Sequence, residues 1–260
     1  MPASPEKGRL LGLRRRLLAV VAGAVVLVGG AIVTATTNLV FSAATASSPV
    51  EITIETNSDE ISLGPSIAGG EYWFAATPRT LPAPPGKLDS CIGRYTWAQG
   101  LHGVDAGQSL VRVNVAAVSA KPVTITGFQL HVLKRSSPLA GVVASCGGRG
   151  GSPFETRSLI SNLDEEPVRT ESYPAGSQQP DPTFAFTLKP GESQVFDVVA
   201  RTFTCFCEWD ATIEGVVEGH TRAFPITDNG KPFATNASSG STIVRYQRSR
   251  WVEVRSPATR

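Results

Sequence analysis

The chain is poor in the residues that most enzymes and metalloproteins use. Its 260 residues include four cysteines, three histidines and one methionine, Met1. Blue-copper sites need two histidines, a cysteine and usually an axial methionine. The one methionine, Met1, is at the N-terminus, which argues against such a site. The patterns H-E-x-x-H, G-x-S-x-G and the P-loop are also missing. We therefore expect no catalytic residue, no bound metal and no cofactor.

An excess of charge of one sign is missing from most of the chain. The formal net charge is +2, but five of the 24 basic residues lie within residues 1–16. The remainder carries 19 basic and 21 acidic residues. Surfaces that bind nucleic acid need a basic patch, so we expect no nucleic-acid partner.

One long hydrophobic run is present, near the N-terminus. Residues 17–37 contain no charged side chain. As a helix this run would extend over about 31 Å, roughly the hydrocarbon thickness of a bilayer. Arg14, Arg15 and Arg16 precede it, and the next basic residue is Arg79, so the positive-inside rule places the N-terminus in the cytoplasm. The pattern predicts a single-pass protein of the cell membrane, held in the lipid bilayer by this helix, with its C-terminal domain extracellular.

The same pattern predicts the domain organisation. A cytoplasmic stub at 1–16 precedes the transmembrane helix at 17–37, which a spacer at 38–49 joins to an extracytoplasmic domain at 50–255. Ala44-Thr45-Ala46 fits a signal-peptidase site, so a cleaved and secreted binding protein is the alternative. Signal peptides usually have a shorter apolar core, of about 7–15 residues, which favours the uncleaved anchor.

Apolar and polar residues alternate along much of the exported domain. The longest example is Cys205–Val217, where Cys205, Cys207 and Trp209 share one face of the expected strand. In Pro122–Lys134 the parity shifts at Gly127, which predicts a β-bulge. The other expected strands are Val50–Thr56, Ile92–Ala98, Leu110–Val118, Leu139–Ser145, Thr183–Leu188, Ser193–Thr204, Thr221–Ile226 and Thr242–Val254.

These nine or ten strands, with no amphipathic helix between them, predict a mainly β fold. We expect an antiparallel β-sandwich, immunoglobulin-like in the broad sense. The aromatic run Tyr72-Trp73-Phe74 is expected in the core, and the proline-rich residues 77–87 are expected to form a loop.

All four cysteines, Cys91, Cys146, Cys205 and Cys207, lie in the exported domain. An even number of cysteines in an oxidising compartment favours disulfides over the alternatives, a metal site or free thiols. A bond between Cys205 and Cys207 would close a tight ring, so we expect one of them to pair with Cys91 and the other with Cys146. Each such bond closes a long loop and would contribute about 3–4 kcal/mol.

The function that this organisation favours is a binding or structural role at the cell envelope. Loops at the ends of a sandwich commonly carry recognition, and residues 99–108 and the glycine-rich and proline-rich segment 146–180 are the candidate contact regions. Within them, His102, Arg149 and Asp164 are the candidate contact residues. The partner would be an envelope protein or a glycan.

The alternative function is an envelope hydrolase. Glu208, Asp210 and Glu214 lie on one face of the expected strand Cys205–Val217 and could supply paired carboxylates, with His102 or His220 as a base. Strand alternation alone accounts for such a polar face, so this is the weaker interpretation.

Several short motifs carry a resemblance to a known group of proteins. These motifs are Cys91 with Arg94-Tyr95-Thr96-Trp97, Cys146 with Gly150-Gly151, Asn162-Leu163-Asp164, Cys205-Phe206-Cys207-Glu208-Trp209 and Asp228-Asn229-Gly230-Lys231-Pro232-Phe233. Together with 18 arginines against six lysines, the series resembles uncharacterised membrane-anchored extracytoplasmic proteins of actinobacterial type. The resemblance covers about residues 85–255. It implies the location and no activity, ligand or catalytic residue.

Overall fold

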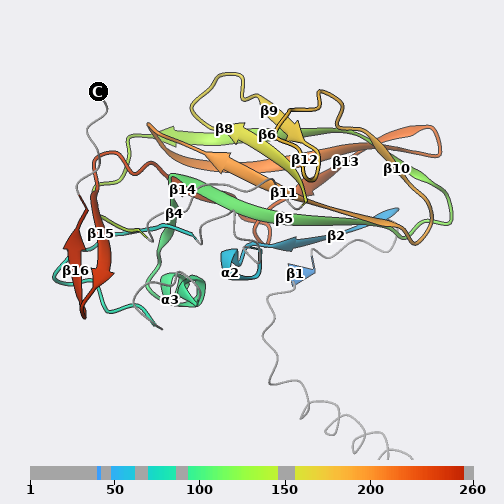
Figure 1. Cartoon of the computed structure of the whole chain (residues 1–260). Coiled ribbons are helices and arrows are strands. Elements are labelled where there is room, and N and C mark those ends of the chain that lie inside the picture. Colours follow the sequence, from blue (N-terminus) through green and yellow to red (C-terminus); the bar gives the residue numbers. More distant parts are fainter. Residues whose placement is uncertain (1–39, 42–47, 62–69, 86–92, 146–155, 255–260) are drawn as a thin grey trace, which may run out of the picture. The chain divides into compact units, whose positions relative to one another are not determined.

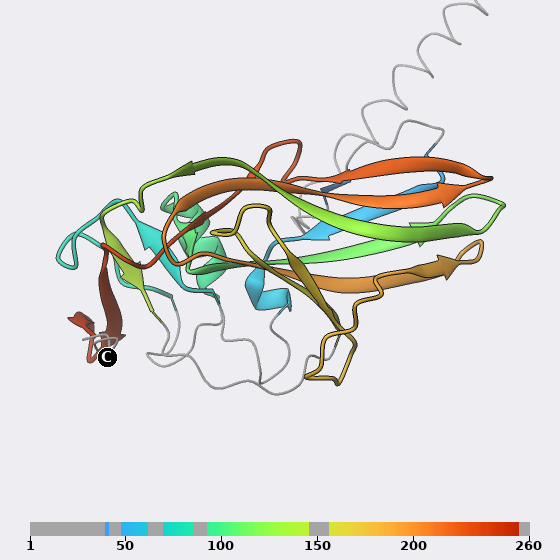
Figure 2. The same ribbon diagram turned by 90° about the horizontal axis from the view of Figure 1, so that it is seen from above.

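The computed structural model of the chain describes residues 40–41, 48–61, 70–85, 93–145 and 156–254 (Figure 1). The expected stub and transmembrane helix lie outside these residues, as do Cys91, Cys146 and Arg149. No helix within the described ranges is long and apolar enough to span a bilayer. Figure 2 shows the same elements from a second direction.

The first of two sheets, sheet A, has six strands. Their spatial order is β1-β2-β5-β11-β8-β9. In that order the strands are Val40–Phe41, Val50–Glu55, Gln108–Ala117, Ser193–Arg201, Arg157–Asn162 and Thr170–Tyr173. Strand β1 lies in the segment that the sequence predicts as a spacer and pairs with β2.

The second sheet, sheet B, has ten strands in the order β10-β6-β12-β14-β4-β3-β7-β15-β16, with β13 also paired to β12. In that order the strands are Phe186–Leu188, Val123–Ser136, Phe206–Val217, Phe233–Asn236, Val104–Ala106, Tyr72–Phe74, Val142–Ala144, Thr242–Gln247 and Arg250–Glu253, and β13 is His220–Ile226. We call β3, β4, β7, β15 and β16, together with helix α3 (Arg94–Gly100), the extension of sheet B.

The mainly β prediction is confirmed, but the prediction of purely antiparallel sheets is wrong. Three pairings are parallel: β11 with β8, β14 with β4, and β15 with β7. Each joins segments that other elements separate along the chain, as a parallel pair requires. Alternation within one strand reports which face is buried and not which strand lies beside it, so the sequence could not show these pairings.

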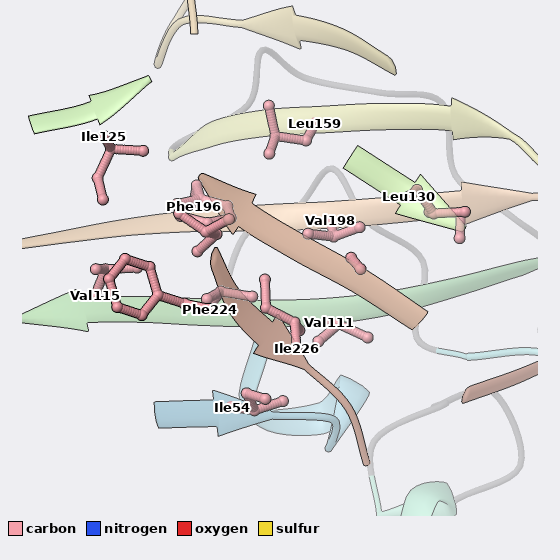
Figure 3. Packing of buried hydrophobic residues seen from close by; sticks show 14 of the residues in the cluster. Ile54, Val111, Val115, Ile125, Leu130, Leu159, Phe196, Val198, Phe224 and Ile226 are labelled. Carbon is pink, nitrogen blue, oxygen red and sulfur yellow. The ribbon is translucent and has the colours of Figure 1, made fainter. Parts of the chain in front are cut away.

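Sheet A and the β6, β12 and β13 part of sheet B share one apolar core, an arrangement consistent with a β-sandwich. Figure 3 shows side chains of both sheets meeting there, among them Val111 and Phe196 from sheet A and Ile125 and Phe224 from sheet B. Strand β12 alternates strictly between buried and partly exposed residues, so the predicted pattern is confirmed. Phe196 is fully buried and packs against the rings of Phe128 and Phe184.

The predicted bulge in β6 is also confirmed. Glu214 pairs with Gly127 and Gly215 pairs with Ile125, so Thr126 has no opposing residue. A second irregularity omits Leu133 from the pairing with β12, and this leucine is 55% exposed. The first bulge allows β6 to present apolar residues on both sides of Thr126 to the core despite the shift of parity.

The predicted strand Ile92–Ala98 is wrong, because Arg94–Gly100 forms helix α3. Arg94 and Ala98, four residues apart, are buried, while Trp97 and Leu101 pack against the apolar cluster of the extension. This is the spacing of a helix face. The apolar stripe of helix α3 is short, so the local sequence alone does not distinguish this helix from a strand.

Two strands, β8 and β9, lie within the segment that the sequence predicts as a loop. Strand β8 contains Ser158 and Ser161, which are fully buried, and Leu159, which joins the main core. Ser161 and Thr170 share a hydrogen bond of 2.8 Å between their hydroxyls. The polar composition therefore hid a buried strand whose serines are satisfied inside the sheet.

The expected disulfide connectivity is also wrong, because Cys205 and Cys207 are bonded to each other. Alternate residues of a fully extended strand lie about 6.7 Å apart, near the upper limit for a disulfide. Cys205 instead ends the turn before β12, and its Cα lies 5.5 Å from that of Cys207, which suits the bond. Both sulfurs are buried at the edge of the main core.

Candidate functional site

A groove of about 450 Å³ lies on the hairpin formed by β8 and β9. Its lining residues are Ile160, Asn162, Glu165, Glu166, Pro167, Arg169 and Glu171. Ile160 and Glu171 are direct partners in the pairing of the two strands, so they share one face of sheet A. The groove lies in the segment 146–180, one of the two contact regions expected from the sequence.

The connection between β8 and β9 is held by an arginine from the other sheet. Arg135 of β6 donates from Nε to the Leu163 carbonyl at 2.9 Å and from Nη2 to the Glu165 carbonyl at 2.7 Å. Its Nη1 forms an ion pair with the Glu166 carboxylate. These contacts fix the backbone that carries two of the lining carboxylates, so the groove wall is positioned by both sheets.

Asp164 anchors the same connection to the turn between β11 and β12. Its carboxylate accepts hydrogen bonds from Thr202 Oγ1 and the Phe203 amide, both at 2.7 Å, and from Thr204 Oγ1 at 2.9 Å. Partial burial by itself raises the pKa of Asp164, but these hydrogen bonds outweigh it and lower the pKa. The structure thus gives this candidate contact residue a set of internal partners.

The groove combines carboxylates with few compensating cations. Of the three glutamates that line it, Glu166 is paired with Arg135, which leaves Glu165 and Glu171 beside the guanidinium of Arg169. Glu165 accepts a hydrogen bond from Asn162 Nδ2 at 3.2 Å, and Glu171 accepts one from the Tyr173 hydroxyl at 2.6 Å, which raises the pKa of Tyr173. Exposed carboxylates around the half-buried Ile160 can accept hydrogen bonds and attract a cationic group.

The structure does not bring the three histidines together. His102 is exposed just beyond the C-terminus of α3, with a φ of 56°. His220 is exposed at the start of β13, opposite Val217, and so lies beyond Glu214 along the sheet. His131 is exposed on β6, directly opposite Asp210 of β12. The histidine beside the carboxylate row is therefore neither of the two proposed from the sequence.

The carboxylates of that row interact with neighbouring strands. Glu208 lies 3.7 Å from the Lys134 ammonium, and Glu214 accepts a hydrogen bond of 3.0 Å from Gln129 Nε2. Lys134 is the direct cross-strand partner of Glu208, and Gln129 is a diagonal neighbour of Glu214. Among the described residues, no group of three or more His, Cys, Asp and Glu side chains could hold a metal ion.

A second set of polar side chains, some buried and some half-buried, lies where sheet A, helix α2 (Ser58–Ile61) and the extension meet. We call it the buried polar cluster; its members are Thr56, Ser58, Asp59, Tyr72, Arg94, Tyr95, Asp105, Ser109 and Thr235. The hydroxyls of Ser58 and Tyr72 lie 2.7 Å apart. The Asp59 carboxylate accepts a hydrogen bond of 3.1 Å from the Tyr95 amide. The Tyr95 hydroxyl lies 2.7 Å from the Thr56 hydroxyl.

The cluster shifts the pKa of most of its ionisable members. Burial raises the pKa of Asp59, Tyr72 and Tyr95, and burial lowers the pKa of Arg94, although Asp59 partly compensates that arginine. Desolvation raises the pKa of Asp105 to about 7, with a further contribution from Asp228. Groups perturbed in this way gather at functional sites more often than elsewhere.

The sequence does not predict this cluster. Its members come from six separate segments, and no spacing or motif joins Ser58, Tyr72, Arg94 and Asp105 along the chain. Only Asp105 falls within a predicted contact region, 99–108. Nothing in the residue pattern could have shown that their side chains meet.

A comparison with family models and with curated proteins found no match to this chain.

Proposed function

We propose that this chain is a single-pass membrane protein whose extracytoplasmic head binds a cationic segment of a cell-envelope protein. The head would be a β-sandwich that is immunoglobulin-like only in the broad sense, since its sheets include parallel pairs. The groove on the β8–β9 hairpin would be the contact site.

The observation that carries this proposal is the fixed arrangement of carboxylates around Ile160. Arg135 and Asp164 hold the connection between the two strands at both sides, so the groove does not need partner binding to form. A preformed site loses less conformational entropy on binding than a flexible loop does. The exposed Glu165 and Glu171 remain available to lysine or arginine side chains of a partner.

The proposed location depends on residues 17–37. Their lack of charge and the arginines before them support an anchored protein with its head outside the cell. The resemblance to membrane-anchored extracytoplasmic proteins supports the same location.

The test is a binding measurement with the full-length chain in detergent micelles. Fluorescein-labelled peptides rich in lysine and arginine are compared with acidic peptides and with soluble glycan fragments of the envelope. The variant Glu165→Gln/Glu171→Gln removes two groove charges, and Glu208→Gln/Glu214→Gln removes two carboxylates from the outer face of sheet B as a matched control.

We expect basic peptides to bind more tightly than acidic ones, and binding to weaken with salt. The groove variant should lose at least about tenfold in affinity, whereas the control should bind like the natural chain. Equal binding by the two variants would place the contact elsewhere. Preferential binding of glycan fragments would replace the proposed peptide ligand.

A further inference from the structure

The hairpin of β15 and β16 carries three arginines within six residues. They are Arg245, Arg248 and Arg250. Arg248 and Ser249 have positive φ values of 48° and 62°, so they form a two-residue turn of the kind that closes tight hairpins. Arg248 and Arg250 are exposed and Arg245 is half-buried, so the turn and the strand ends beside it present a basic surface to solvent.

One face of this hairpin packs onto the extension. Tyr246 and Trp251 are cross-strand partners on that face, with their ring centroids 5.1 Å apart. Trp251 also stacks on Trp97 of α3 at 6.1 Å between centroids and donates from Nε1 to the Leu81 carbonyl at 3.0 Å. These contacts hold the hairpin in place, so its arginines are positioned before any partner binds.

The opposite face of the hairpin carries the arginines of the two strands. Arg245 is paired with Val252 and Gln247 with Arg250, so Arg245 and Arg250 are diagonal neighbours on this face. Glu253, the one acidic residue of the hairpin, lies on the packed face instead. The arginine face therefore has no carboxylate of its own strands to neutralise it.

Other parts of the head do not neutralise these arginines either. Within the ranges that the structure describes, no ion pair involves Arg245, Arg248 or Arg250. The Nε atom of Arg245 is buried without a hydrogen-bond partner. Guanidinium groups bind carboxylates through pairs of parallel hydrogen bonds, so a surface with exposed glutamates fits this face.

The groove on the β8–β9 hairpin is such a surface. Glu165 and Glu171 are exposed there, and Arg169 offsets part of their charge. Figure 1 and Figure 2 both show the β15–β16 hairpin at the edge of the extension, apart from the β8–β9 hairpin. The arginines are thus placed to reach the groove of another copy and not the groove of their own chain.

We propose that the cationic partner of the groove is the β15–β16 hairpin of a second copy of this chain. This inference rests on the proposed function, because it names the partner of the same groove. Arg248 and Arg250 of one copy would pair with Glu165 and Glu171 of the next. Since the two surfaces differ, the contact is head-to-tail, and copies would add into rings or open chains. Anchoring in one bilayer would raise the local concentration of the copies, so a weak contact suffices.

The test is sedimentation equilibrium of the full-length chain in micelles of an uncharged detergent. We expect the average mass to rise with protein concentration and to fall with added salt. Arg248→Glu/Arg250→Glu reverses the charge of the hairpin, and Glu165→Arg/Glu171→Arg reverses the charge of the groove. Each double variant should weaken self-association at least about tenfold.

An equimolar mixture of the two variants separates a direct contact from a general effect of charge. The natural hairpin of one variant fits the natural groove of the other, and the two reversed surfaces also fit each other, so mixing should restore association. Lys121→Glu/Arg222→Glu is the matched control, since it reverses two exposed cations outside both surfaces and should associate like the natural chain. Retention of self-association by either charge-reversal variant, or no restoration on mixing, would overturn the proposal.

Peptide binding distinguishes this inference from the proposed function. Arg248→Glu/Arg250→Glu keeps the natural groove and should bind basic peptides like the natural chain. A natural chain that binds these peptides but stays monomeric at every concentration would overturn this inference and leave the proposed function standing. A natural chain that does neither would overturn both.

Discussion

The sandwich core and the extension of sheet B are built by different means. In the core, β11 pairs with β5 over nine consecutive residues, and β6 pairs with β12 along a register that two bulges interrupt. Their buried aliphatic and aromatic side chains form one large cluster. In the extension, strands of three or four residues from distant segments meet, such as β3, β4 and β7. Its apolar clusters are small, and the buried polar cluster lies against them.

This difference indicates which region is stable over a wide range of conditions and which region responds to changes in those conditions. Burial of alternating apolar side chains stabilises the core over a wide range of conditions, because it does not depend on a protonation state. The extension depends on hydrogen bonds, close backbone contacts and buried ionisable groups, each of which responds to solvent or to small changes of shape. The following predictions test that contrast, beginning with the largest effect.

Truncation in the core should be the most damaging change. Phe196→Ala removes a fully buried ring that contacts Phe184 at 5.4 Å between centroids, and we expect a loss of about 3–5 kcal/mol in the free energy of unfolding. Phe203→Ala is the control, since Phe203 is 67% exposed, and it should change stability by less than about 0.5 kcal/mol. Chemical denaturation measures both, and similar losses for the two would contradict the assignment of the core.

A single methyl group should disturb the extension. A Cβ at Gly141 would lie 2.3 Å from the Phe74 carbonyl oxygen and 2.7 Å from Trp73 Nε1, so Gly141→Ala forces β3 and β7 apart. We expect a loss of about 2–3 kcal/mol. Gly100→Ala, at the end of α3 with no atom within 4 Å of the new Cβ, should be neutral or slightly stabilising. Equal effects would mean that β3 and β7 tolerate separation.

The stability of the extension should depend on pH through Asp105. Its folded-state pKa of about 7 lies above its ordinary value of 3.8, so its contribution to stability is complete below about pH 4 and is lost as the pH rises through about 7. Relative to the natural chain, Asp105→Asn should therefore gain on the order of 2 kcal/mol at pH 8 and little at pH 4. Thermal unfolding at the two pH values measures this difference. An equal effect at both values would show that folding does not shift the pKa of Asp105.

The Cys205–Cys207 bond should contribute less than a bond that closes a long loop. It encloses three residues, for which the chain-entropy model gives about 1.6 kcal/mol. Cys205→Ser/Cys207→Ser should lose about that amount in non-reducing denaturation. The tryptic peptide Thr202–Arg222 contains both cysteines, and without reduction it should be lighter by two hydrogen atoms. Its recovery linked to a peptide containing Cys91 or Cys146 would contradict the bond.

The residue pattern predicts the segment that contains the candidate site, but not the residues that line it. The glycine-rich, proline-rich and polar composition of the segment 146–180 predicts a recognition region, and the groove lies within it. The lining residues Glu165, Glu166 and Glu171 were not predicted, because nothing local shows that Arg135, on a strand far along the chain, positions their backbone. The sequence predicts Asp164 as a contact residue, but only the folded chain shows that Thr202 and Thr204 are its hydrogen-bond partners.

The sequence by itself determined the strands whose alternation is strong and the division between a hydrophobic N-terminal run and a β-rich domain. Alternation is a local property: a strand half-buried on a core must bury every second side chain, whatever its neighbours are. The tertiary structure alone decided the three parallel pairings, the bond between Cys205 and Cys207, and the meeting of Asp105 with Tyr72 and Asp228. These depend on contacts between distant segments, and their free energies arise only when the chain closes the intervening loops.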